Sequence, residues 1–201
     1  MEDQEFLNRL WFIGDNKTVK KIKKSIKGTD ETDKTRQIHI DFNKIIPMPA
    51  ELDIESDNAV ALATIFSLHT QETGIPKLNK HPLELNKEEF NLYLSYIKNV
   101  YNYKHMNWLS WRSLKWNSAW NAYDTKEKDN YIQFKTQHSP SLNITLALSR
   151  QFKTIEFIHG WVDRETGSPG KFIFKDGSAS PANFENSYES SAFATNLLED
   201  K

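Results

Sequence analysis

The chain has 201 residues, a formal net charge of −1 and no cysteine. The absence of cysteine excludes disulfides and thiolate metal sites, and it favours a reducing compartment. The near-neutral charge argues against a protein that wraps duplex DNA by counterion release. An apolar fraction of 38% with a charged fraction of 26% is typical of a soluble globular protein.

The N-terminal segment MEDQEFLNRL is acidic and lacks the basic and apolar regions of a signal peptide. No apolar run approaches the roughly 18 residues that a membrane-spanning helix needs. We therefore expect a cytoplasmic protein that does not associate with a membrane.

The first predicted elements alternate strand and helix. Phe6–Ile13 is a run of apolar, aromatic and branched residues and predicts a strand. A helix should follow it, because the next apolar residues recur at helical spacing: Val19, Ile22 and Ile26. The alternation of apolar and polar residues in Ile38–Ile46 predicts a second strand, which ends at Pro47.

Two helices are predicted in the middle of the chain. Ser56–Thr73 predicts the first, and Asn86 and Glu89 have the spacing of a capping box that opens the second. The apolar stripe of the second helix consists of Phe90, Tyr93, Leu94, Ile97 and Tyr101. We expect this helical pair to be an insertion at about residues 53–115 of a larger domain.

Two strands and a further helix are predicted next. The polar segment Thr125–Asn130 is expected to be a turn between two strands, Trp120–Tyr123 and Tyr131–Thr136. Ser139-Pro140-Ser141 marks a helix start. The buried face of that helix should carry Ile144, Leu148 and Phe152.

The final elements complete the predicted fold. Thr154–Val162 and Lys171–Lys175 predict an antiparallel pair, and the residues after Gly177 are rich in serine, asparagine and alanine. Two strand–helix units that share one antiparallel sheet form the split β-α-β, or ferredoxin-like, arrangement of the α+β class. We therefore expect a ferredoxin-like domain over residues 1–177 with a helical insertion, and a C-terminal tail over 178–201.

Residues 107–124 carry four of the six tryptophans: Trp108, Trp111, Trp116 and Trp120. Polar and basic side chains lie between and beside them, among them Arg112, Lys115, Asn121 and Tyr123. One interpretation is that the indoles form the core of a small domain, since each can bury about 150–250 Å². The other is that some of them line a groove that binds a flat or charged partner.

Two segments resemble a known family. DFNKIIPMPAEL (Asp41–Leu52) and KWNSAWNAYD (Lys115–Asp124) are similar to motifs of the YubB-type ferredoxin-like family, which phages and plasmids encode. The resemblance extends over about Phe6–Gly177. The chain departs from the family pattern at Ser118-Ala119, where relatives more often carry glycine and threonine. The resemblance implies the fold and a mobile-element origin, and small accessory proteins of such elements often counter host defences.

Sequence patterns for catalysis and metal binding are missing. The six histidines form neither an H-x-[ST] pair nor an H-E-x-x-H motif, and no glycine-rich phosphate loop is present. No pattern places two carboxylates across a cleft, as a glycosidase would require. The aromatic signature of RNA-binding ferredoxin-like domains is absent as well. We therefore expect no catalytic residue, no metal and no cofactor.

The first predicted helix is rich in lysine. Its six lysines are Lys17, Lys20, Lys21, Lys23, Lys24 and Lys27. They form either a basic surface for nucleic acid or an acidic partner, or a solvated helix face. The candidate basic surface consists of Lys17, Lys20, Lys21 and Lys24.

The prediction for function is a non-enzymatic binding protein of a phage or plasmid. It should act in the bacterial host by binding a host defence protein or by sequestering a nucleotide-like signal molecule. The alternative is a nucleic-acid-binding accessory protein that uses the lysine-rich helix and stacking aromatic residues. The predicted partner-binding surface consists of Trp108, Trp111, Arg112, Lys115, Trp116, Trp120, Asn121 and Tyr123.

Overall fold

The computed structural model describes residues 4–68 and 80–199. Its contacts divide the chain into two compact units. One unit joins Met1–Pro47 to Leu114–Lys201 and contains the large sheet, and the other is the helical segment Met48–Ser113. Among the described residues, no helix is long and apolar enough to cross a membrane.

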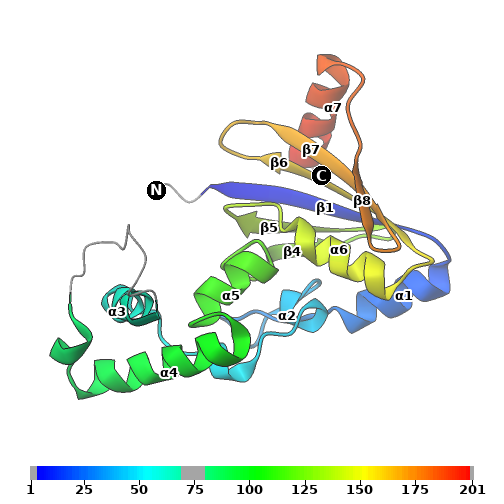
Figure 1. The fold of residues 1–201 in the computed structure, drawn as a ribbon. Coiled ribbons are helices and arrows are strands. Elements are labelled where there is room, and N and C mark those ends of the chain that lie inside the picture. The colour runs from blue at the N-terminus through cyan, green and yellow to red at the C-terminus, as the bar shows by residue number, and fades with distance from the viewer. Residues whose placement is uncertain (1–3, 69–79, 200–201) are drawn as a thin grey trace. The chain divides into compact units, whose positions relative to one another are not determined.

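The sheet unit has six antiparallel strands in the order β4-β5-β1-β6-β7-β8 (Figure 1). Their bounds are β1 Glu5–Ile13, β4 Tyr123–Glu127, β5 Tyr131–Gln137, β6 Glu156–Asp163, β7 Pro169–Lys175 and β8 Ser178–Pro181. The strands β4, β5, β1 and β6, with the helices α1 (Asn16–Ser25) and α6 (Leu142–Gln151), form the predicted split β-α-β arrangement. The ferredoxin-like α+β fold is confirmed, and β7 and β8 extend it at one edge.

One face of the sheet packs against α1 and α6 (Figure 1). Strand residues alternate between the two faces, and on this face β1, β5 and β6 contribute Leu10, Phe134 and Phe157, which are completely or almost completely buried. From the helices come Ile22 and Leu148, which are fully buried. The spacing of apolar residues in the sequence predicted the elements that form this core.

The opposite face is covered by α7 (Ser187–Leu198), which packs on β1, β6 and β7 (Figure 1). Leu197 and Ala194 of this helix are buried against Leu7 and Val162. The prediction of a separate tail over 178–201 is therefore corrected: β8 pairs with β7, and α7 belongs to the core of the sheet unit. Apolar side chains three and four residues apart (Phe193, Ala194 and Leu197) give this helix one buried face in a serine-rich segment.

The predicted strand Ile38–Ile46 is wrong. Of this range only Ile38 belongs to a strand, β3 (Gln37–Ile38), which pairs with β2 (Gly28–Thr29), and a short helix α2 (Phe42–Ile45) follows. The Asp41 side chain accepts a hydrogen bond of 2.9 Å from the backbone N–H of Asn43 and so caps α2. This local hydrogen bond competes with strand pairing, whereas the alternating apolar residues are buried without entering the large sheet.

The tryptophan segment joins the sheet later than predicted. Strand β4 begins at Tyr123 and continues to Glu127, with a register shift between Tyr123 and Lys126. The predicted strand Trp120–Tyr123 therefore overlaps β4 only at its last residue, and half of the predicted turn Thr125–Asn130 is strand. The error has a physical cause, because a polar edge strand with a bulge lacks the strict alternation that marks a strand in the sequence.

The helical unit contains α3 (Asn58–Leu68), α4 (Lys87–Tyr103) and most of α5 (Trp108–Lys115), with short 3-10 turns at Ala50–Leu52 and Pro82–Glu84. The capping box at the start of α4 is confirmed. Asn86 Oδ1 accepts from the N–H of Glu89 at 3.0 Å, and Glu89 Oε2 accepts from the N–H of Asn86 at 2.7 Å. The predicted helix Ser56–Thr73 corresponds to α3, and its last residues, from 69, lie outside the described ranges.

A buried polar network crosses the core of the sheet unit. His159 Nδ1 lies 2.7 Å from Thr145 Oγ1 of α6, and its Nε2 lies 3.2 Å from Asn8 Oδ1 of β1. Asn8 Nδ2 donates in turn to Thr136 Oγ1 at 2.9 Å. Complete burial lowers the pKa of His159 from 6.5 to about 3, because the charged imidazolium would lose its hydration.

We expect this histidine to make the fold sensitive to acid. Its folded pKa lies below its unfolded pKa, so the unfolded chain binds the extra proton and stability falls as the pH drops below 6.5. Between about pH 7 and about pH 5, the wild type should lose about 2 kcal/mol more unfolding free energy than His159→Gln. Urea denaturation at the two pH values measures the difference. His138→Asn, at an exposed histidine, should behave as the wild type, and equal losses in wild type and His159→Gln would contradict this assignment.

Candidate functional site

The four indoles of the tryptophan segment differ in burial. Trp116 is 0% exposed and Trp111 is 6% exposed, whereas Trp120 is 46% exposed. Trp108 is partly buried. The segment thus combines the two interpretations of the sequence, because part of it is core and part of it faces outward.

The predicted partner-binding residues are divided between the two units. The helical unit holds Trp108, Trp111 and Arg112, and the sheet unit holds Lys115, Trp116, Trp120, Asn121 and Tyr123. Within the helical unit, the Arg112 guanidinium lies 5.4 Å from the centre of the Trp108 ring, one helical turn away on α5. Within the sheet unit, only Trp120, Asn121 and Tyr123 border the same pocket.

Trp116 is a core residue. Its Nε1–H donates to the carbonyl oxygen of Ile46 at 2.9 Å, and its ring packs edge-on against Phe42 at a centroid distance of 5.8 Å. The prediction that Trp116 contacts a partner is corrected, because a fully buried ring cannot reach a ligand without unfolding. Trp111, which is also buried, is corrected in the same way.

The Asn121 side chain is engaged within the protein. Its Oδ1 accepts from the N–H groups of Phe42 and Ala122, both at 2.9 Å. Its Nδ2 donates to Asp41 Oδ1 at 2.8 Å. Asn121 therefore forms a wall of the pocket and positions its neighbours, whereas the sequence analysis placed it among the residues that contact a partner.

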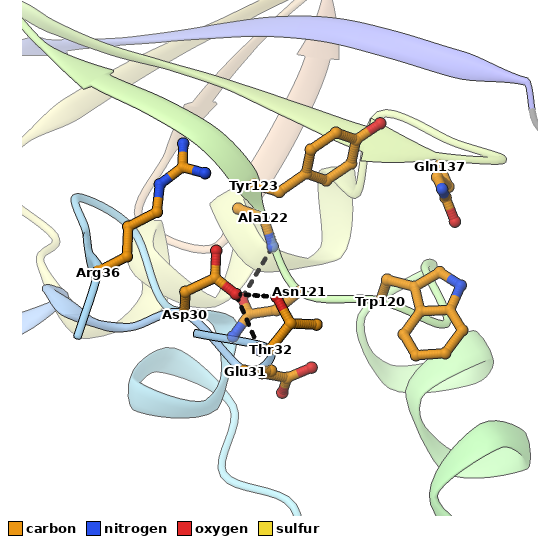
Figure 2. A pocket seen from close by; sticks show the side chains of 9 residues that line it. All are labelled: Asp30, Glu31, Thr32, Arg36, Trp120, Asn121, Ala122, Tyr123 and Gln137. Carbon is orange, nitrogen blue, oxygen red and sulfur yellow. Dashed lines mark hydrogen bonds between the residues drawn. The ribbon is translucent and has the colours of Figure 1, made fainter. Parts of the chain in front are cut away.

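A pocket of about 380 Å³ lies beside the exposed indole (Figure 2). Its lining residues come from the β2–β3 hairpin, from the segment that enters β4, and from the end of β5: Asp30, Glu31, Thr32, Arg36, Trp120, Asn121, Ala122, Tyr123 and Gln137. The sequence indicated the tryptophan side of this pocket, whereas none of the hairpin residues was among the predicted site residues.

Two consecutive turns give the hairpin loop a defined shape. Asp30 Oδ1 accepts from the N–H of Thr32 at 2.9 Å and from its hydroxyl at 2.7 Å. Asp33 Oδ1 binds Thr35 in the same way, at 3.0 and 2.6 Å. The repeated Asp-x-Thr pattern in DETDKT, residues 30–35, could have indicated these turns.

Local hydrogen bonds favour the charged form of two loop carboxylates, those of Asp30 and Asp33. The Thr32 hydroxyl and backbone N–H hydrogen bonds hold the pKa of Asp30 below its usual value, and Thr35 does the same for Asp33. The Arg36 guanidinium lies 3.8 Å from Asp124 Oδ1, and Lys135 Nζ lies 3.1 Å from the other oxygen of that carboxylate. The positive charge at this end of the pocket therefore has a local carboxylate partner.

The hydroxyl group of Tyr123 is held by a hydrogen bond to β1. Its hydroxyl donates to Glu5 Oε2 at 2.7 Å, and burial together with this carboxylate raises its pKa. Arg164 and Lys135 also contact the Glu5 carboxylate. The hydroxyl is therefore held by β1, and it is the Tyr123 ring that borders the pocket (Figure 2).

The lysine-rich helix α1 presents two kinds of lysine. Lys17, Lys20, Lys21 and Lys24 are exposed, and no ion pair between described residues involves them. Lys23, in contrast, is buried and donates to the carbonyl oxygens of Lys128 and Asp129 at 2.5 and 3.1 Å. Desolvation lowers its pKa. Lys27 forms an ion pair of 2.5 Å with Glu127.

The pocket lining combines aromatic, charged and polar side chains. Its lining offers two aromatic rings, two carboxylates and several amide and hydroxyl groups, and no histidine. Within residues 4–68 and 80–199, no group of three or more histidine and acidic side chains could hold a metal ion.

Comparisons with known proteins bear on the fold. Residues 115–195 match a family model described as the ferredoxin-like domain in Api92-like protein. The crystal structure of a protein api92 from Yersinia pseudotuberculosis is similar over 92% of this chain and 99% of that chain, with 10% sequence identity and a TM-score of 0.42. A search of curated proteins found no match. Lys115–Thr195 is therefore similar to the C-terminal ferredoxin-like domain of Api92-like proteins.

The different burial of Trp116 and Trp120 predicts different effects on stability. Trp116→Ala should lower the unfolding free energy by about 3–5 kcal/mol, because it leaves a cavity and an unpaired Ile46 carbonyl. Trp120→Ala should cost less than about 1 kcal/mol, since nearly half of the ring is already hydrated. Urea denaturation followed by circular dichroism measures both. Similar losses for the two variants would contradict the structural assignment.

Proposed function

We propose that this protein is a non-enzymatic binding protein of a phage or plasmid, and that it inhibits host defence by binding a host immune protein in the cytoplasm of the bacterial host. Its origin and setting are supported by the resemblance of Asp41–Leu52 and Lys115–Asp124 to the YubB-type family. The binding role is supported by the pocket at Trp120.

The exposed indole of Trp120 is the observation that carries the proposal. A tryptophan ring that is 46% exposed beside a pocket leaves apolar surface in water that a partner could bury. Tryptophan and tyrosine are enriched among the residues that dominate binding energy at protein interfaces. Trp120 and Tyr123 both border this pocket, so it has two candidate anchors.

A protein partner suits the pocket better than a nucleotide-like signal. Asp30 and Glu31 place two carboxylates at the lining, and these would repel phosphate groups. The one guanidinium of the lining, Arg36, already lies near Asp124. The sequence also has no glycine-rich loop that could bind phosphates through backbone N–H groups.

Two experiments test this proposal: a plating assay in cells and a binding measurement on the purified complex. We expect expression of the chain in a defended host to raise the plating efficiency of a restricted phage, and a tagged chain to retain one host protein in a one-to-one complex. Trp120→Ala should weaken that complex at least about tenfold, which corresponds to about 1.4 kcal/mol. Calorimetric titration of the purified pair gives the dissociation constant.

The matched control is Tyr188→Ala, which removes another strongly exposed aromatic side chain, from α7. It should leave both the plating efficiency and the dissociation constant unchanged. Full activity of Trp120→Ala in both assays, or a reaction product formed by the purified chain, would refute the proposal.

A second candidate function is nucleic-acid binding through α1. It is favoured by the four exposed lysines without an ion pair among the described residues. This alternative predicts that affinity for a single-stranded oligonucleotide falls with salt, with a logarithmic slope of about −0.7 per phosphate contact. The variant Lys17→Glu/Lys20→Glu/Lys24→Glu should then flatten the slope, as measured by fluorescence anisotropy at several salt concentrations. A salt-independent affinity would exclude this function.

A further inference from the structure

We infer that α4 of the helical unit binds an amphipathic helix of a partner protein, one that carries acidic residues beside its own apolar stripe. The surface involved is the outer stripe of α4, which consists of Phe90, Leu94, Ile97 and Tyr101. It belongs to a different unit from the pocket at Trp120, so the inference goes beyond the proposed function and does not depend on it.

The outer stripe points away from the side of α4 that the helical unit covers. Tyr96 and Asn99 are the buried residues of α4, whereas Phe90, Leu94 and Tyr101 are 44%, 50% and 81% exposed. At 3.6 residues per turn, the two sets lie on nearly opposite sides of the helix, about 160° apart. The stripe is therefore a separate surface, and it is not the rim of the buried side.

Polar contacts hold the covered side of α4 in place. The Tyr96 hydroxyl donates to the carbonyl oxygen of Glu55 at 2.7 Å. Asn99 Nδ2 donates to the carbonyl oxygens of Glu51 and Met106 at 2.9 and 3.0 Å. These bonds fix the rotation of the helix, so that it buries polar groups inside its unit and leaves apolar side chains in water. An apolar surface that stays in water is typical of an interaction site.

The spacing and width of the stripe indicate a helical partner. Its residues follow one another at intervals of four, three and four, which is the repeat of a coiled-coil seam. They span only about 60° of the helix circumference, whereas a helix that packs on a core uses an apolar face of about 100° or more. The Phe90 ring stacks on Tyr93 at a centroid distance of 5.8 Å, which orders one end of the stripe. A narrow stripe of this kind fits one partner helix better than a flat surface.

Lysine side chains border the stripe. Lys87 and Lys98 are exposed and eleven residues apart, which places both on the same side of α4, next to the stripe. No ion pair between described residues involves either of them. The pKa of Glu51 is lowered by its own backbone N–H, by a hydrogen bond with Tyr103 and, as the smallest cause, by the charge of Lys98. Acidic residues on the flank of a partner helix would therefore meet two accessible positive charges.

The same charges disfavour a second copy of this chain as the partner. The glutamates of α4, Glu88 and Glu89, lie about 100° or more from the stripe, and Glu89 is bound by Lys80. In an antiparallel pair of α4 helices matched stripe to stripe, Lys87 of one copy would lie beside Lys104 of the other. In a parallel pair each lysine would face its own counterpart. Both arrangements bring like charges together.

The length of the stripe sets the expected affinity. Phe90 and Tyr101 are separated by about 17 Å along the helix axis. One such contact buries less than the roughly 800 Å² per partner of a standard interface. We therefore expect a transient complex with a dissociation constant in the micromolar range.

The test uses the full chain and synthetic peptides. The acidic peptide has about three heptads, with isoleucine and leucine at the two apolar positions and glutamate at both flanking positions. The basic peptide is its matched control and carries lysine in place of every glutamate. Both are labelled with fluorescein, and binding is followed by fluorescence anisotropy. Vesicles of equal parts phosphatidylcholine and phosphatidylglycerol test a lipid surface, and analytical ultracentrifugation of the chain alone tests self-association.

We expect saturable binding of the acidic peptide, about tenfold or more tighter than that of the basic peptide. Leu94→Asn should weaken it about tenfold, and Lys98→Glu about threefold. The matched controls are Leu198→Asn, at a leucine of α7 that is 47% exposed, and Lys20→Glu, at an exposed lysine of α1. Both controls should bind as the wild type, and circular dichroism verifies that every variant is folded.

Several results would overturn the inference. They are no binding of the acidic peptide, equal binding of the two peptides, and a loss with Lys20→Glu as large as that with Lys98→Glu. Vesicle binding that Leu94→Asn abolishes would assign the stripe to lipid, and a dimer that Leu94→Asn dissociates would assign it to a second copy. Trp120→Ala should leave peptide binding unchanged, so the result is independent of the proposed function.

Discussion

The hydrogen bonds of the Asn121 side chain connect two distant parts of the sheet unit. They join the segment that follows α1, at Asp41 and Phe42, to the segment that enters β4. Asp41 is itself fixed, because its N–H donates to the carbonyl oxygen of Ile26 at 2.7 Å. Gly28 permits this approach, since a Cβ there would lie 2.2 Å from Asp41 Oδ2. Trp116, packed on Phe42, seals the same junction.

The candidate site depends on this junction. Trp120 and Tyr123 flank Asn121 in sequence, and the β2–β3 hairpin lies between α1 and Asp41 along the chain. When Asn121 holds Asp41 and Phe42, the hairpin loop and the exposed indole are brought to the same pocket. The two motifs that resemble the YubB-type family thus act first as structure. Phe42, Trp116 and Asn121 of these motifs are buried and position the site, and Trp120 reaches its surface.

The second face of the sheet is partly covered by α7. In RNA-recognition domains a four-stranded sheet presents stacking aromatic residues on an open face. Here α7 packs on β1, β6 and β7, and Phe193 lies beside Trp11 at a centroid distance of 6.2 Å. Arg9 is buried below the helix, where its Nη1 donates to Asn196 Oδ1 at 3.0 Å. The covered part of this face cannot stack bases. Trp120, in the segment before β4, is exposed.

Local patterns in the sequence predicted those elements whose residues bury one regular face. The stripe of Val19, Ile22 and Ile26 led to α1, the Asn86–Glu89 pair led to the start of α4, and the order of strands and helices led to the ferredoxin-like class. The same reasoning failed at Ile38–Ile46. There, a capping bond from Asp41 outweighed an alternating pattern, because burial of the apolar residues did not require a strand.

Composition and spacing alone determined that this chain folds as an α+β domain and that its tryptophan segment is the unusual part. Only the tertiary structure decided which indoles are sealed and which one is open. The reason is that burial of a ring depends on what packs over it, and the covering groups come from residues far away in the chain: Phe42 and Ile46 over Trp116, and the hairpin from Asp30 beside Trp120. The pocket exists only where those distant segments meet.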